Sequence, residues 1–346
     1  MSKKLRGLFD YEYQLELINK HQPPLQKLNK VIDWEIFRSP IEEALAVEPK
    51  APGGRPPFDR LMMFKILILQ RYYNLSDEQT EFQIKDRLSF MQFLELQIGD
   101  TVPDEKTVWL FKENLKEKGL SKKLFELFTK ALSTNGIVAK EGSIVDASFV
   151  NVPRQRNTRE ENGDIKKGAV PLAFGKNKAK LIQKDCDARW MKKNGERHYG
   201  YKNHVNTDMK TKLITKFSTS SAAPHDSTET ENLFDESDNV AYADSAYRSE
   251  KIETYLQSIN CKSHIHEKGY RNKPLETQQE LHNHMKSKIR SRVEHVFGFM
   301  TNSMNNGLNL RGIGKKRIDE QIALLNLTYN LCRFEQLVRL QKVKVM

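Results

Sequence analysis

Three acidic residues of the sequence have the type and the setting of metal-binding carboxylates. Asp146 lies in the middle of Ser143–Val150, a run of small, β-branched and aromatic residues that predicts a strand. Asp244 directly follows a second apolar run, Asn239–Ala243, and Glu294 lies on a long predicted helix. A buried acid is unfavourable unless it is paired or binds a metal, so the three positions are candidate ligands.

An oxygen-only ligand set predicts a particular chemistry. Two carboxylates on adjacent strands repel each other unless a divalent cation lies between them. Three oxygen ligands without cysteine or a dense histidine cluster suit Mg²⁺ or Mn²⁺. Two such ions about 3.5–4 Å apart would activate a hydroxyl nucleophile and stabilise the leaving oxygen of a phosphodiester. The pattern is therefore typical of nucleases, polymerases and strand-transfer enzymes.

Each acid also has a structural alternative. Asp146 alone is explained as well by an edge strand whose acid faces water, and Asp244 by a turn at a strand end. Glu294 follows Arg290 by four residues, the spacing of an ordinary surface ion pair on a helix. Only the joint occurrence of the three acids favours catalysis, and it requires that they converge in space.

The elements that must position these acids describe a mixed sheet. From residue 143 to 300 we expect a strand, a hairpin of His198–Asn206 and Lys212–Ser218, a helix, a strand, a helix, a strand and the helix Thr277–Met300. Three antiparallel strands followed by β-α-β crossovers are the order of ribonuclease-H-like domains, an α/β sheet flanked by helices. The polar tract 153–197 is expected to be a loop or mobile insertion.

The remaining segments predict helices. Residues 1–138 form an N-terminal, mainly α-helical domain, interrupted by the turn-rich segment Ala51–Pro57. Helices at 76–87 and 103–118 resemble a helix-turn-helix pair, although their separation exceeds the usual short turn. This domain would bind DNA ends, dimerise, or both. Residues 139–335 would form the catalytic domain, and a helix from Lys315 would extend into a C-terminal tail, 336–346.

Charge and composition point to nucleic acid as the partner. The net charge is +12, and Lys176–Lys216 contains 12 basic and 4 acidic residues. Trp190, Tyr199 and Tyr201 are interleaved there, so the tract could neutralise phosphates and stack bases, although aromatic residues in strands more often belong to a core. No membrane span, secretory signal or paired-cysteine motif is expected, which predicts a cytoplasmic protein.

Eight short motifs follow one another along the chain, from about residue 50 to 335. They are Gly54-Arg55-Pro56-Pro57-Phe58-Asp59, Leu75-Ser76-Asp77, Pro103-Asp104-Glu105-Lys106-Thr107, Val145-Asp146-Ala147-Ser148, Gly200-Tyr201-Lys202-Asn203-His204, His225-Asp226-Ser227, Ala243-Asp244-Ser245-Ala246-Tyr247-Arg248 and Arg290-Ser291-Arg292-Val293-Glu294-His295-Val296-Phe297-Gly298. The ordered set resembles the DDE transposases of bacterial insertion sequences, in the insertion-sequence-five group.

This resemblance implies a function and an assembly. Asp146, Asp244 and Glu294 would be the catalytic acids and the ligands of two Mg²⁺ or Mn²⁺ ions. The substrate would be double-stranded DNA, cleaved at the terminal inverted repeats of the element and joined to target DNA through its 3′-hydroxyl. A homodimer or higher multimer would act on the bacterial nucleoid. A ribonuclease-H-like nuclease that only cuts, and a DNA-binding regulator without catalysis, remain alternatives.

Four basic residues are candidate phosphate contacts, and two further positions differ from the family. The candidate contacts are Arg290, Arg292, Lys202 and Arg248. The arginines Arg290 and Arg292 are favoured because a guanidinium can bind phosphate in a bidentate manner. The helix of related transposases carries Tyr and Lys where this chain has Ser287 and Thr301.

Overall fold

The computed structural model describes residues 10–46, 56–193, 195–270 and 274–345. The predicted hinge at 51–57 and the first motif therefore lie partly outside the described residues, and the N-terminal residues 1–9 lie wholly outside them. The chain divides into two compact units, one of residues 1–120 with 334–346, and the other of residues 121–333. No helix among the described residues is long and apolar enough to cross a membrane.

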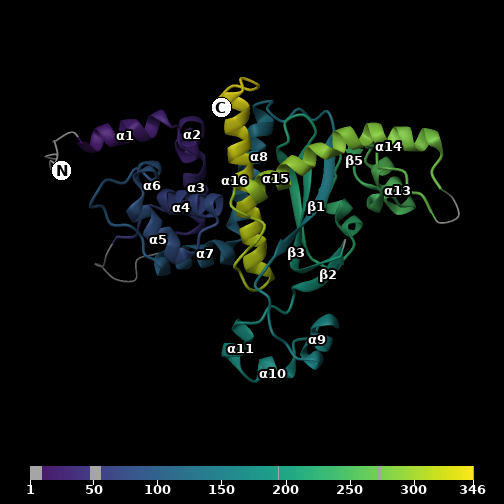
Figure 1. Ribbon diagram of the computed structural model, residues 1–346, viewed down its shortest axis with the longest axis horizontal. Coiled ribbons are helices and arrows are strands. Elements are labelled where there is room, and N and C mark those ends of the chain that lie inside the picture. The colour runs from purple at the N-terminus through teal and green to yellow at the C-terminus, as the bar shows by residue number, and fades with distance from the viewer. Residues whose placement is uncertain (1–9, 47–55, 194, 271–273, 346) are drawn as a thin grey trace, which may run out of the picture. The chain divides into compact units, whose positions relative to one another are not determined.

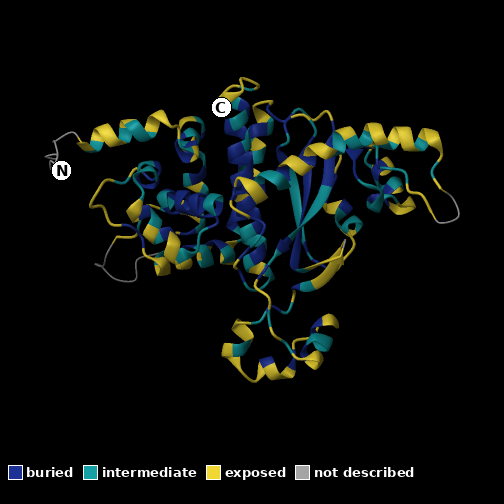
Figure 2. Cartoon of the chain, in the orientation of Figure 1, coloured by how far each residue is buried: buried dark blue, intermediate teal, exposed yellow. Residues whose placement is uncertain are grey.

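The first unit is helical, as its sequence predicts. Its elements are α1 (Asp10–Lys20), α2 (Pro24–Val31), η1 (Trp34–Phe37), α3 (Arg38–Ala44), α4 (Arg60–Tyr73), α5 (Asp77–Asp86), α6 (Leu88–Phe93) and α7 (Glu105–Lys118). Helix α4 is buried along most of its length, dark blue in Figure 2, because apolar residues occur on all its faces. Trp34, Phe37 and Phe93 pack around this helix, with Trp34 and Phe93 in edge-to-face contact at 5.7 Å.

Local capping signals correctly predicted where the helices α5 and α7 begin and end. The Ser76 hydroxyl accepts a hydrogen bond from the Gln79 amide, and the Asp104 carboxylate accepts one from the Thr107 amide. Gly119 ends α7 in the left-handed conformation, with φ of 56°. Helix α6 lies between α5 and α7 in the chain, so the two predicted helices are not joined by the short turn of a helix-turn-helix motif.

A six-stranded mixed sheet organises the second unit (Figure 1). Its strands are β1 (Ser143–Asn151), β2 (Arg189–Lys193), β3 (Glu196–Asp208), β4 (Ile214–Ser221), β5 (Val240–Tyr242) and β6 (Lys262–Ser263). Strand β3 pairs antiparallel with β1, β2 and β4, whereas β5 pairs parallel with β1 and β6. This is the predicted ribonuclease-H-like order, and the fold-class prediction is confirmed.

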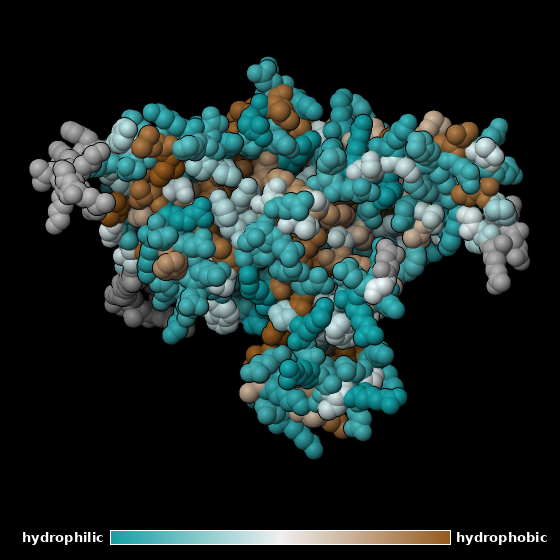
Figure 3. Space-filling model, viewed as in Figure 1, coloured by the Kyte–Doolittle hydropathy of each residue, from teal (hydrophilic) through white to brown (hydrophobic). Residues whose placement is uncertain are grey.

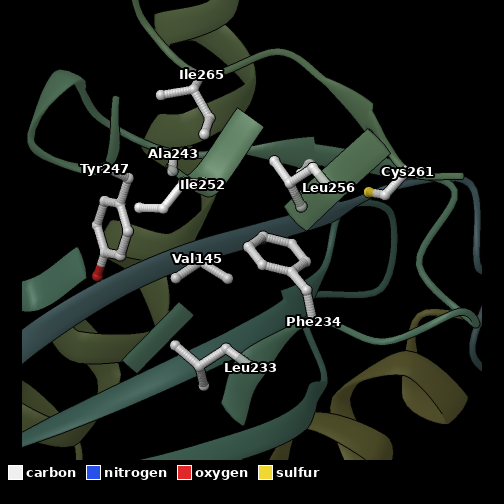
Figure 4. Packing of buried hydrophobic residues seen from close by; sticks show 10 residues of the cluster. Val145, Leu233, Phe234, Ala243, Tyr247, Ile252, Leu256, Cys261 and Ile265 are labelled. Atoms are coloured by element: carbon white, nitrogen blue, oxygen red, sulfur yellow. The ribbon is translucent and has the colours of Figure 1, made fainter. Parts of the chain in front are cut away.

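The two faces of the sheet bury different kinds of residue. Val145 points into an apolar cluster with Leu233, Ile252 and Leu256, which come from α12 (Thr230–Leu233) and α13 (Glu250–Ser258) (Figure 4). Because side chains alternate along a strand, Asp146 faces the opposite side. Asn203 on that side exchanges hydrogen bonds of 2.7 and 3.1 Å with Asn326 of α16 (Lys315–Arg339). The apolar cluster thus holds β1 from one side, while the face that carries Asp146 combines polar residues such as Asn203 with buried apolar ones such as Val205.

The polar tract 153–197 is structured, in contrast to the predicted loop. It contains α9 (Arg159–Lys166), α10 (Leu172–Gly175), α11 (Lys178–Ile182) and β2. The three helices stand apart from the sheet in Figure 1, and the face of them seen in Figure 3 is mainly hydrophilic. The signal that was overlooked is Asn194-Gly195, the preferred sequence of a two-residue hairpin loop, between β2 and β3. A high polar content therefore did not prevent pairing of β2 with β3.

Two predicted long helices also differ in detail. Thr277–Met300 is interrupted: α14 (Thr277–Arg290) is followed by the 3₁₀ segment η4 (Ser291–Val293) and then by α15 (Glu294–Asn302). Helix α8 (Leu120–Thr134) lies within the region 1–138 that was predicted to be mainly helical. Helix α16 ends at Arg339, within the segment predicted as a tail. The interruption at η4 falls between Arg290 and Glu294, directly at the predicted site.

Candidate active site

Asp146 and Asp244 are brought together by strand register. Strands β1 and β5 pair in parallel, with Ser143 beside Ala241 and Ile144 beside Tyr242. Extending this register by two residues places Asp244 level with Asp146, because 98 residues separate both pairs. The Asp244 carboxylate caps η3 (Ser245–Tyr247) by accepting a 2.7 Å hydrogen bond from the Ala246 amide. The adjacency of the two acids was predicted, whereas this capping contact was not.

Arg290 connects the strand acid to the helix acid. Its Nη1 donates a hydrogen bond of 2.9 Å to Asp146 Oδ2, and its Nη2 donates one of 3.1 Å to Glu294 Oε1. Asp146 and Arg290 are both partly buried, whereas Glu294 is exposed. The pairing of Arg290 with Glu294 was the structural alternative for Glu294, and its additional contact with Asp146 joins that pair to the sheet.

Burial and a like charge make Asp146 hard to ionise. The pKa of Asp146 is raised to about 6, chiefly by burial and to a smaller extent by the negative charge of Asp244. The Ala147 amide, which donates a 2.8 Å hydrogen bond to Oδ1, and the Arg290 guanidinium lower this pKa. The balance indicates a site that is short of positive charge, as expected for carboxylates that bind a cation.

Other basic groups at this site were not predicted from the sequence. The positive charge of Lys193 on β2 lowers the pKa of Asp146. The pKa of His266 is lowered by burial and by the charges of Arg290 and Lys286, and is raised by Asp244. These residues come from the overlooked strand β2, the segment after β6 and α14. No sequence spacing relates them to the three acids, so only the tertiary fold identifies them.

Lys202 does not face solvent as its predicted DNA contact requires. Its ammonium is buried, 2.7 Å from the Asp226 carboxylate, and donates a 2.6 Å hydrogen bond to the Pro224 carbonyl. Lys202 is opposite Phe149 in the pairing of β1 and β3, on the face away from Asp146. In this conformation burial and pairing occupy the charge of Lys202, and its binding of phosphate stays a prediction that these contacts do not support.

The remaining predicted phosphate contacts differ in whether their charge is already paired and in how exposed their side chains are. The Arg248 guanidinium lies 3.2 Å from both Glu253 and Glu267, so its charge is already paired. The exposed Arg292 donates a 3.0 Å hydrogen bond to the Met209 carbonyl. Of the four predicted basic residues, Arg292 alone is exposed.

The carboxylates match a divalent metal in chemistry but not in their present placement. Oxygen ligands of this kind suit Mg²⁺ or Mn²⁺. Among the residues with described coordinates, however, no group of three or more His, Cys, Asp or Glu side chains lies close enough together to hold a metal ion. Arg290 instead contacts two of the three acids, so the acids would have to rearrange to bind an ion.

Comparison with known families identifies the chain. Residues 12–114 match the model of a transposase domain (DUF772), and residues 139–331 match the model of a transposase DDE domain. The second match alone covers more than half of the sequence and contains all three acids. The chain belongs to the DDE transposase family. No solved structure matched the chain.

In this transposase, Ser287 and Thr301 stand where the resemblance predicts Tyr and Lys. Each forms a hydrogen bond with a backbone carbonyl of its own helix. The Ser287 hydroxyl donates to the Asn283 carbonyl at 2.8 Å, and the Thr301 hydroxyl donates to the Phe297 carbonyl at 2.9 Å. Short hydroxyl side chains that bond within their helix do not reach as far as the Tyr and Lys they replace. Arg290, the last residue of α14, contacts Asp146 and Glu294 instead.

Proposed function

We propose that this transposase binds the terminal inverted repeats of its insertion sequence, cleaves the DNA phosphodiester there and joins the free 3′-hydroxyl to target DNA. The observation that supports it is the register of β1 with β5, which brings Asp146 level with Asp244, while Arg290 links Asp146 to Glu294. These three acids are the proposed catalytic residues and the proposed ligands of two Mg²⁺ or Mn²⁺ ions.

The proposed metal ions would supply Lewis-acid chemistry. Divalent ions would act as Lewis acids toward the attacking hydroxyl and the leaving oxygen of the phosphodiester. The contribution of the chain is to hold the acids on two paired strands and one helix, which limits their movement. The partly buried setting of Asp146 strengthens its electrostatic interaction with a bound cation relative to water.

Other parts of the chain have proposed roles in DNA handling. The helical domain 1–138 would bind the element ends or dimerise, and the basic insertion 153–197 would contact DNA outside the catalytic site. The residues Lys176, Lys178, Lys192, Lys193 and Arg197 are exposed in this insertion. At least a homodimer would assemble on paired ends, in the bacterial cytoplasm and on the nucleoid.

The decisive experiment separates cleavage, strand transfer and binding. Asp146→Asn should abolish cleavage of a duplex carrying the element end, and abolish transfer of a pre-cleaved end, while end binding remains. Asp187→Asn, which changes an exposed acid of the same unit, is the matched control and should retain both reactions. Strand transfer by the Asp146→Asn protein would refute the proposed site, and a wild-type protein that cuts without joining would be a nuclease.

A further inference from the structure

We propose that the Arg290 guanidinium occupies the place of a bound cation among the three carboxylates. A divalent metal must then displace it from Asp146 in order to bind. Without metal, the Arg290 side chain would then keep Asp146 and Glu294 hydrogen-bonded to its guanidinium. This inference rests on the proposed metal-dependent function, and it concerns how the site is assembled rather than which reaction follows.

The hydrogen bonds of Arg290 involve the same carboxylates that are proposed to bind the metal. Asp146 Oδ2 accepts from Arg290 Nη1 at 2.9 Å, and Asp146 Oδ1 accepts from the Ala147 amide at 2.8 Å. Both oxygens of the acid are thus engaged before any ion arrives. Glu294 Oε1 accepts from the other terminal nitrogen of the same guanidinium, at 3.1 Å. One arginine therefore forms hydrogen bonds with two of the three acids.

Electrostatics oppose the simultaneous presence of the metal and the guanidinium. A guanidinium within hydrogen-bonding distance of Asp146 would lie within a few ångströms of an ion bound to the same carboxylate. Like charges at that separation repel strongly in a partly buried site, where solvent screening is reduced. Among the described residues, no three His, Cys, Asp or Glu side chains lie close enough together to hold a metal ion. This agrees with a site in which the Arg290 guanidinium is the cation.

The surrounding structure would allow Arg290 to move. Arg290 is the last residue of α14, and η4 separates it from α15, which begins at Glu294. Helix α14 buries none of its side chains and is mainly yellow or teal in Figure 2. Its polar attachments include Lys286 to the Ile265 carbonyl at 2.8 Å and Asn283 to the Glu267 backbone. Val293 of η4 is buried, so the movement would be confined to the Arg290 side chain, whose torsions can carry the guanidinium away from Asp146 while this valine stays packed.

The alternative is a fixed clamp, in which Arg290 orders Asp146 and Glu294 so that they can bind the metal together. The two models predict opposite effects of removing the charge. Under competition, Arg290→Gln strengthens metal binding, because a competing cation is gone. Under the clamp model, the same substitution weakens metal binding, because the acids lose their common partner.

The test measures Mn²⁺ binding directly, from the electron paramagnetic resonance signal of the free ion, at pH 7.5 and constant ionic strength. Arg290→Gln should lower the Kd of the full-length protein by about tenfold, the size expected for one charge-assisted hydrogen bond to a carboxylate. Lys288→Gln is the matched control: it removes one exposed positive charge two residues before Arg290 on the same helix, and its Kd should not change.

The outcomes distinguish this inference from the proposed function. Asp146→Asn should abolish tight Mn²⁺ binding, and a wild-type protein that binds no Mn²⁺ would overturn both proposals. Wild-type binding with an equal or higher Kd for Arg290→Gln would overturn the inference alone. If circular dichroism shows that this variant does not fold, Arg290→Lys decides instead. Lysine cannot form the two-pronged contact, so its Kd should fall below that of wild type, and an unchanged or higher Kd would again overturn competition.

Discussion

The Lys202 ammonium lies 2.7 Å from Asp226 Oδ1, and the two side chains are only 6% and 18% exposed. Lys202 also lies 5.5 Å from the centre of the Phe149 ring. A lysine that the sequence suggested for DNA binding is therefore part of the packing between β3 and the segment that leads into α12. These contacts favour a role of Lys202 in stabilising the fold.

Replacing this lysine should destabilise the protein. Lys202→Met leaves Asp226 buried without its partner, which is expected to lower the free energy of unfolding by about 3 kcal/mol. Lys210→Met is the control, because Lys210 forms a solvent-exposed pair with Glu141 whose loss should leave stability nearly unchanged. Urea denaturation measures both effects. Weaker DNA binding by Lys202→Met with unchanged stability would restore the original prediction.

Metal binding should depend on pH through Asp146. Because the pKa of Asp146 is raised to about 6, its carboxylate is ionised above this pH and protonated below it. A metal binds the ionised form, so affinity should be nearly constant above pH 7 and should fall by about tenfold per pH unit below pH 6. Isothermal titration with Mn²⁺ between pH 5 and 8 measures this dependence. An affinity that is flat down to pH 5 would contradict the assignment of Asp146 as a ligand.

Asp185 should anchor the insertion to the sheet. Its carboxylate is buried and accepts hydrogen bonds from the Tyr201 hydroxyl at 2.7 Å, the Gly314 amide at 2.9 Å and the amides of Asp187 and Ala188. Asp185→Ala should lower the free energy of unfolding by about 2–4 kcal/mol, because it leaves these donors unsatisfied. It should also speed proteolysis within 153–188. Asp187→Ala, at an exposed neighbour, should change stability by less than about 0.5 kcal/mol.

The basic insertion should contribute to the salt dependence of DNA binding. Arg154, Lys176 and Lys178 are exposed there, and replacing all three with Gln should reduce the slope of log K against log salt by up to about 3. Lys251, Lys262 and Lys268, also exposed but outside the insertion and the helical domain, provide a control with the same loss of charge. Fluorescence anisotropy of a labelled duplex at 50–300 mM salt measures the slopes. Equal slopes for the wild type and the insertion variant would exclude these three residues as phosphate contacts.

Outside the polar tract 153–197, the sequence by itself determined most of the helices and strands and their order. Capping residues such as Ser76 and Asp104, the stop at Gly119 and the strand around Asp146 are local signals, since each depends on residues a few positions apart. The order of strands and helices was enough to predict a ribonuclease-H-like sheet and to place Asp146 beside Asp244. The motifs together indicated the transposase family.

Only the tertiary structure decided which charges pair. Arg290 meets Asp146 across 144 residues of sequence, and Lys202 meets Asp226 on the other face of the sheet. Neither contact follows from periodicity, because a side chain's partner depends on strand register, helix interruption and burial acting together. For the same reason, the sequence proposed four phosphate-binding residues, whereas the fold leaves Arg292 as the most accessible and ties Arg290 to the acids.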